Sequence, residues 1–234
     1  MKLLVIVFNP SIEGTPGELS NEGTRYSPLA LFETHRDELY DVSGGAVALD
    51  VVEIIQAGFP PQIGAPLLTY ESHMQCLNDE PNCNNEKQAD YEHIIQDYDL
   101  CERVAAHEVD EVWILGDTGF GFHESRMVGQ GAFKVNAPPL MIEGCDRPLV
   151  IMGYNYARRN PEMLHNFGHR VDDTLSHYID NGRAGLDANM IQPCLVNGLI
   201  SALVKVAPKA HRLCIGRPLC AVGRSRDTNM EFGP

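Results

Sequence analysis

The chain has 234 residues, of which 44% are hydrophobic, so it is long enough to bury a substantial core. Its net charge of −14 argues against binding to a nucleic-acid backbone, which normally requires clustered Lys and Arg. No apolar stretch approaches the ~20 residues of a membrane-spanning helix. We therefore expect neither a nucleic-acid partner nor insertion into a membrane.

The first part of the chain predicts strands and helices in alternation. Residues 2–8 form an aliphatic run that ends at Asn9-Pro10, which is typical of a strand buried on both faces of a parallel sheet. A polar loop over residues 11–27 follows, then a short helix over 29–42 and a β-branched strand over 46–55.

The second part continues this alternation. Apolar residues at helical spacing predict a helix over residues 86–107, followed by a strand over 110–116 and a connection rich in Gly and Pro over 117–139. A strand over 147–153 and a helix over 161–179 come next, with Asn160 as the N-cap. The pattern predicts an α/β fold with an open, mostly parallel sheet, helices on both faces and long loops. We expect a single domain over residues 1–199 and a basic, irregular tail over 200–234.

The cysteines and the N-terminus bear on the cellular compartment. None of the seven cysteines forms a C-x-x-C motif, whereas Cys76 and Cys83 bracket a polar loop that suits a small disulfide. Free buried thiols are the alternative. The run from Leu3 to Phe8 is too short for a signal-peptide core. We expect an extracellular protein whose leader has been removed, with a cytoplasmic location as the alternative; the oligomeric state has no signal in the sequence.

Two histidines one helical turn apart are the first sign of chemistry. His165, His169 and Asp172 fall on one side of the predicted helix over 161–179, and the apolar residues fall on another. Two imidazoles and a carboxylate can hold one divalent metal ion, and zinc is the ion we expect. The protease motif H-E-x-x-H is absent, so any general base must come from elsewhere. Solvated histidines on a polar helix face are the alternative.

Polar residues follow several predicted strands, where parallel sheets bind their ligands. We expect catalytic roles for four of them and substrate-binding roles for five. Glu124 is a third metal ligand, in place of Asp172, or a general base, and Arg126 or Arg158 stabilises an oxyanion. Asp117 is a candidate partner carboxylate for Glu124, although Glu124 and Arg126 also suit a surface ion pair. The substrate-binding candidates are Asn9, Ser125, Tyr154, Asn155 and Tyr156.

Several of these stretches carry a family resemblance. The stretches are Val109 to Trp113, His123-Glu124-Ser125-Arg126-Met127, Asn136-Ala137-Pro138-Pro139, Ile151 to Tyr156, and His165-Asn166-Phe167-Gly168-His169-Arg170. In them the chain resembles a group of uncharacterised, often exported microbial proteins over roughly residues 1 to 180. The resemblance implies that the stretches form one site, but the group has no established activity and supplies no reaction. After about residue 190 the chain departs from the aromatic-rich region expected of the group.

Three functions fit these patterns. The first is a metal-dependent hydrolase that acts on a small-molecule, glycan or peptide-type substrate, with a metal-bound water as the nucleophile. The second is a non-catalytic extracellular glycan-binding protein. The third is a metal-free glycosidase that uses Asp117 and Glu124 as a carboxylate pair. A serine hydrolase is disfavoured because Ser125 does not stand in a G-x-S-x-G motif.

Overall fold

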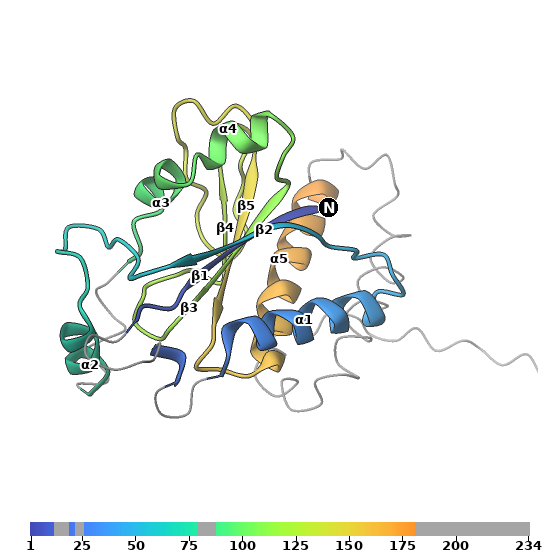
Figure 1. Ribbon diagram of the computed structural model, residues 1–234. Helices are drawn as coiled ribbons and strands as arrows, with labels where there is room; N and C mark the ends of the chain where they lie inside the picture. Colours follow the sequence, from blue (N-terminus) through green and yellow to red (C-terminus); the bar gives the residue numbers. More distant parts are fainter. Residues whose placement is uncertain (12–18, 22–25, 79–87, 181–234) are drawn as a thin grey trace, which may run out of the picture.

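A five-stranded sheet forms the middle of the fold (Figure 1). The computed structural model describes residues 1–11, 19–21, 26–78 and 88–180. Along the sheet the strands follow the order β2-β1-β3-β5-β4, and all are parallel except β4, which pairs antiparallel with β5 at one edge. The predicted open, mostly parallel α/β fold is confirmed. The strands are β1 (Lys2–Phe8), β2 (Asp50–Ala57), β3 (Glu111–Gly116), β4 (Ser125–Val128) and β5 (Leu149–Asn155).

Helices cover both faces of the sheet, so the described part of the chain has three layers. Two helices, α1 and α5, lie on one face, and α3 and α4 lie on the other (Figure 1). The helices are α1 (Pro28–Val42), α2 (Tyr70–Asn78), α3 (Tyr91–Asp97), α4 (Leu100–Ala105) and α5 (Asn160–Asp180), with a short 3-10 helix at Leu19–Asn21. Asn160 is the first residue of α5, and its side-chain amide donates a hydrogen bond to Glu38 of α1.

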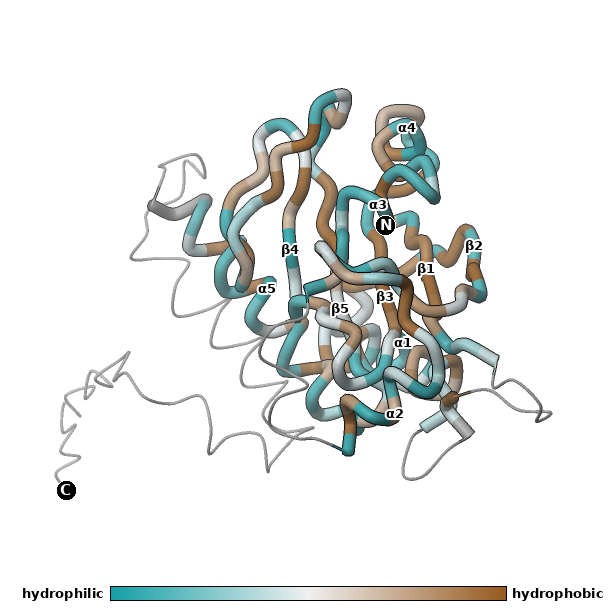
Figure 2. The backbone as a smooth tube through the Cα atoms, turned by 90° about the vertical axis from the view of Figure 1, so that its left-hand side faces the viewer, coloured by the Kyte–Doolittle hydropathy of each residue, from teal (hydrophilic) through white to brown (hydrophobic). Residues whose placement is uncertain are grey.

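Strand β1 shows why the sheet needs both layers. Residues 3–8 are all buried, and side chains of a strand point alternately to its two faces. Leu4, Ile6 and Phe8 therefore join the core beneath α3 and α4. Leu3, Val5 and Val7 join the core beneath α1 and α5. The hydropathy colouring places apolar stretches along β1 and β3 in the middle of the fold (Figure 2).

Several elements differ from the sequence-based expectation. The helix predicted over 86–107 is two helices, because Asp99 adopts a left-handed backbone conformation (φ 50°) between them. Helix α2 and strand β4 were not predicted. Strand β4 has four residues inside a segment rich in Gly and Pro, and its extended form comes from pairing with β5.

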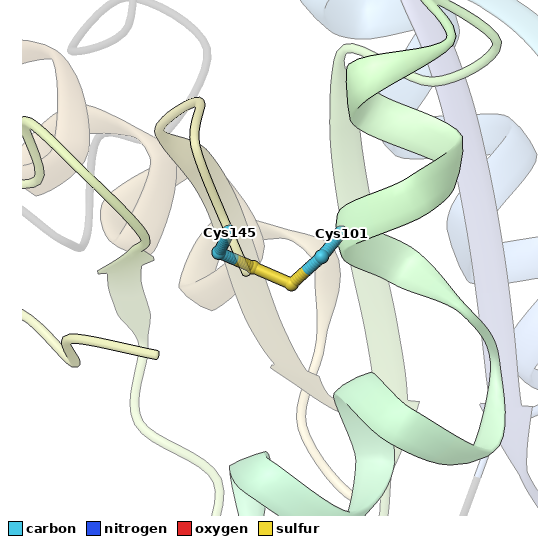
Figure 3. The surroundings of a disulfide bond; sticks show 2 residues. All are labelled: Cys101 and Cys145. Carbon is cyan, nitrogen blue, oxygen red and sulfur yellow. A yellow bond between two sulfur atoms is a disulfide. The ribbon is translucent and has the colours of Figure 1, made fainter. Parts of the chain in front are cut away.

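A disulfide joins Cys101 of α4 to Cys145 in the connection between β4 and β5 (Figure 3). The sequence did not predict this pair, since 44 positions separate the two cysteines. Cys76 is also disulfide-bonded, but Cys83, its expected partner, lies outside the described residues.

Two further expectations concern other parts of the chain. The domain boundary at residue 199 and the basic tail over 200–234 lie outside the described residues. Among the helices that are described, none combines the length and the apolar character needed to span a bilayer.

Candidate metal centre

Three side chains bring potential metal ligands together beside the first half of α5. One ligand atom from each of Glu124, His165 and His169 lies within 4.8 Å of the others, and all three residues are half-buried. The Nε2 atoms of the two histidines lie 3.0 Å apart. Two nitrogens on a tetrahedral zinc ion would lie about 3.3 Å apart, given zinc–nitrogen bonds of about 2.05 Å. A shift of a few tenths of an ångström would therefore accommodate the ion.

Gly153 of β5 explains how Glu124 reaches the histidine helix. Its N–H donates to the Glu124 carbonyl at 3.0 Å, and its own carbonyl accepts the Asn166 side chain of α5 at 3.1 Å. A Cβ at position 153 would lie 2.2 Å from the backbone oxygen of His123. The missing side chain lets the segment that carries Glu124 lie directly against β5, beside the first turns of α5.

A cavity of about 380 Å³ adjoins this group on the Glu124 side. It lies at the carboxyl ends of β3 and β5, where ligands of open α/β sheets bind. The glycine-rich loop after β3 forms one wall, and the first two turns of α5 form another. The lining residues are Gly116, Asp117, Thr118, Gly119, Gly121, Phe122, Glu124, Gly153, Tyr154, Asn155, Arg158, Glu162, Met163 and Asn166.

Several predicted site residues border this cavity. Arg158 stands at its rim, where it is 62% exposed and lies 3.9 Å from Glu162. Asn155 and Thr118 both line the cavity, and the side-chain amide of Asn155 donates a 2.9 Å hydrogen bond to the Thr118 hydroxyl. Tyr154 also borders the cavity, but its hydroxyl lies 3.3 Å from Nε2 of the buried His35.

Other predicted substrate-binding residues are enclosed. Ser125 is fully buried and donates to the Val135 carbonyl at 3.1 Å. Tyr156 is 1% exposed and donates its hydroxyl to the Phe8 carbonyl. Neither side chain is open to a substrate, which corrects the expectation. Ser125 is the first residue of β4 and pairs with β5. Tyr156 follows β5 and joins the core beneath α1 and α5.

Asn9 is also buried, and its amide exchanges two hydrogen bonds with Ser20, each 2.9 Å long. These bonds tie the end of β1 to the 3-10 helix. The expected substrate contact at Asn9 is therefore replaced by a structural one.

The expected catalytic Asp117 forms a buried pair with His73 of α2. Its Oδ2 lies 2.9 Å from the His73 Nε2, and the two side chains are 0% and 1% exposed. The rings of Phe59 and Phe120 enclose the imidazole. Although residue 117 borders the cavity, its carboxylate faces His73. This pair could not be predicted, because His73 belongs to α2, a helix that was not predicted.

Two more predicted residues lie apart from the ligand group. The Arg126 Nε donates to the Pro138 carbonyl at 3.2 Å, and its guanidinium lies over the Tyr91 ring. Burial, followed by the charge of Arg126, lowers the pKa of the neighbouring His123. Asp172 is exposed and is outside the group, so Glu124 is the carboxylate that joins the histidines.

Some residues of the site were not predicted from the sequence. Asn166 holds α5 to Gly153, and Asn136 donates its amide to the Glu124 Oε2 at 2.8 Å. Both residues lie inside the stretches that carry the family resemblance, which is the only signal that pointed to them. Glu162 was not predicted either; it lies one helical turn before Asn166 on α5, so both residues line the cavity.

The chain was compared with protein families, with curated proteins and with solved structures. None of the three comparisons finds a match.

Proposed function

We propose that the chain is a metal-dependent hydrolase whose divalent ion, with zinc expected, is bound by Glu124, His165 and His169. The single observation that supports this proposal is the convergence of these three ligand atoms beside a cavity. Two imidazoles and one carboxylate are a donor set that zinc uses in catalytic sites, where three protein ligands leave a position open.

In the proposed chemistry the metal ion, the cavity and Arg158 have different roles. A bound ion lowers the pKa of a coordinated water, which becomes a nucleophile near neutral pH. The substrate would occupy the cavity next to Glu124. Arg158 stands at the cavity rim, where it is 62% exposed and, among the described residues, makes a long 3.9 Å contact with Glu162, so its guanidinium could turn toward a developing oxyanion.

The proposed substrate is the glycan or peptide-type molecule expected of the hydrolase. A volume of about 380 Å³ suits a group the size of one sugar ring or one to two amino-acid residues. We also propose an extracellular location, which the Cys101–Cys145 disulfide supports because such bonds persist in oxidising compartments.

The alternatives fit the geometry less well. A glycosidase that uses Asp117 and Glu124 needs two carboxylates open to the substrate, and the Asp117 side chain is enclosed against His73. A glycan-binding protein would use exposed aromatic rings, but Tyr154 and Tyr156 are 2% and 1% exposed. Binding without turnover is therefore kept as an outcome of the test.

The test begins with metal binding to the full-length chain. Purified protein, stripped with chelator and titrated with Zn²⁺ in a calorimeter, is expected to bind one equivalent. The double variant His165→Ala/His169→Ala should lose this binding. His93→Ala is the matched control, because His93 is 59% exposed on α3 and its neighbour is Asp97, outside the ligand group.

Hydrolysis is then measured on ester, peptide and glycosidic substrates with and without the bound ion. Turnover that requires both the ion and the two histidines supports the proposal. If the wild-type chain binds neither zinc, manganese nor calcium, the metal centre is wrong. Stoichiometric metal with saturable glycan binding and no turnover would favour the non-catalytic alternative.

A further inference from the structure

Asn136 contacts both elements that contribute to the candidate metal centre. Its side-chain Nδ2 donates to the Glu124 Oε2 at 2.8 Å. Its backbone N–H donates to the Asp173 Oδ2 of α5 at 2.5 Å. One residue in the connection between β4 and β5 thus bonds to the segment of Glu124 and to the helix of the two histidines.

The position of Asp173 makes the second bond relevant to the site. Residues 165, 169 and 173 follow one another at intervals of four, so they lie along one side of α5. A bond from residue 136 to residue 173 therefore holds the same side of the helix that carries the ligands.

The backbone of Asn136 is in a conformation that few residues adopt. Its φ of 56° is left-handed, which costs free energy for residues other than Gly and is tolerated best by Asn and Asp. The flanking residues enforce it, since Val135 and Ala137 are buried and the Ala137 N–H donates to the Ser125 carbonyl at 3.2 Å. Such locally strained residues cluster at functional sites.

We infer that Asn136 is a positioning residue of the metal centre: its side-chain amide orients the Glu124 carboxylate, and its backbone N–H fixes that carboxylate relative to His165 and His169. This inference rests on the proposed metal site. The amide binds one carboxylate oxygen of Glu124, and a carboxylate has a second oxygen that can bind the ion. Hydrogen bonds of this kind to ligating side chains commonly change metal affinity by about 10- to 100-fold.

The decisive variant is Asn136→Gly. Glycine adopts the left-handed conformation without strain and keeps the backbone N–H for Asp173, so only the amide donor to Glu124 is lost. Lys134→Gly is the matched control, because Lys134 is exposed in the same connection and its replacement adds the same backbone freedom. Asp173→Ala tests the second bond separately.

Zinc affinity is measured by competition with a chromogenic chelator, and the visible spectrum of the Co²⁺-substituted protein reports ligand geometry. We expect Asn136→Gly and Asp173→Ala to bind zinc about 10- to 100-fold more weakly and to shift the Co²⁺ bands. Lys134→Gly should match the wild type in both measurements.

The possible failures are distinguishable. If wild-type protein binds no metal, the proposed function fails at its first step. If the wild type binds zinc and Asn136→Gly binds it within threefold, with an unchanged Co²⁺ spectrum, the positioning role is wrong while the metal centre stands. An equal loss of affinity in Lys134→Gly would likewise overturn it, because loop flexibility would then account for the effect.

Discussion

The His35 side chain is a buried imidazole in the core between α1 and the sheet, where it packs against Trp113 and Tyr154. Burial lowers its pKa to about 3, and the nearby Asn160 side chain opposes this effect. Between pH 6.5 and pH 3 the unfolded chain therefore binds a proton that the folded chain does not. The free energy of unfolding must fall as the pH falls through this interval.

The expected loss from His35 is about 5 kcal/mol over the full interval, since each pKa unit corresponds to about 1.4 kcal/mol. His35→Gln keeps a hydrogen-bonding group for Tyr154 but does not titrate. We expect urea unfolding of this variant, followed in chelator between pH 7 and pH 4.5, to depend less steeply on pH than that of the wild type. Parallel pH profiles would contradict the assignment of a neutral buried His35.

Gly153 makes a second prediction at the residue scale. A Cβ at this position would meet backbone rather than a movable side chain, so Gly153→Ala must displace the segment that carries Glu124. We expect a destabilisation of about 1–3 kcal/mol, together with weaker zinc binding. Gly58→Ala is the control, because a Cβ there has no neighbour within 4 Å. Equal stability and equal zinc affinity of the two variants would show that the Glu124 segment tolerates the shift.

At the scale of elements, an ion pair between α5 and β3 holds the histidine helix to the sheet. The Arg170 guanidinium lies 2.6 Å from the Glu111 carboxylate, which is 1% exposed and also accepts the Trp113 N–H at 2.8 Å. Burial raises the pKa of Glu111, while Arg170 and the Trp113 bond oppose the rise. The pair therefore offsets the cost of enclosing a carboxylate.

Arg170→Met should leave that carboxylate buried without its cation, at a cost of about 3–5 kcal/mol near neutral pH. Because the lowering effect of Arg170 is gone, the pKa of Glu111 rises further, and the variant should lose stability as the pH rises through that pKa. The double variant Arg170→Met/Glu111→Gln should recover most of the loss in urea unfolding at pH 7.5. A double variant as unstable as the single one would assign the loss to packing instead.

The sequence predicted best the elements whose buried side chains form a continuous or regularly spaced apolar pattern. Strand β1 matches its expected bounds because every residue from 3 to 8 is apolar. Strand β4 and the break at Asp99 escaped prediction because partners distant in the sequence determine both, β5 in one case and the packing of two short helices in the other. Local propensity carries no signal for either.

In the candidate site, too, the sequence predicted what depends on local spacing and missed what depends on distant partners. Helical spacing placed His165 and His169 together, and the rule for parallel strands put Glu124 at the same edge of the sheet. The rule could not tell which residues after a strand face the cavity, so it included the enclosed Ser125 and Tyr156. It also could not pair Asp117 with His73, which depends on where α2 packs.

At the scale of the whole molecule, the Cys101–Cys145 bond joins α4 to the connection between β4 and β5, at the core on the face opposite α5 (Figure 3). It closes a loop of 44 residues that contains all of β3 and β4. Cross-linking such a loop restricts the unfolded chain, and the chain-entropy relation gives about 4 kcal/mol of stabilisation.

The double variant Cys101→Ala/Cys145→Ala isolates this bond, whereas a reductant would also open the disulfide of Cys76. We expect the variant to lose about 4 kcal/mol in urea unfolding and to retain the zinc affinity of the wild type. The two results belong together, because the bond acts on the unfolded chain and on the face of the sheet opposite the histidine helix. A variant that unfolds like the wild type would mean that the packing of α4 already restrains this loop, and a loss of zinc affinity would mean that the bond also positions the segment of Glu124.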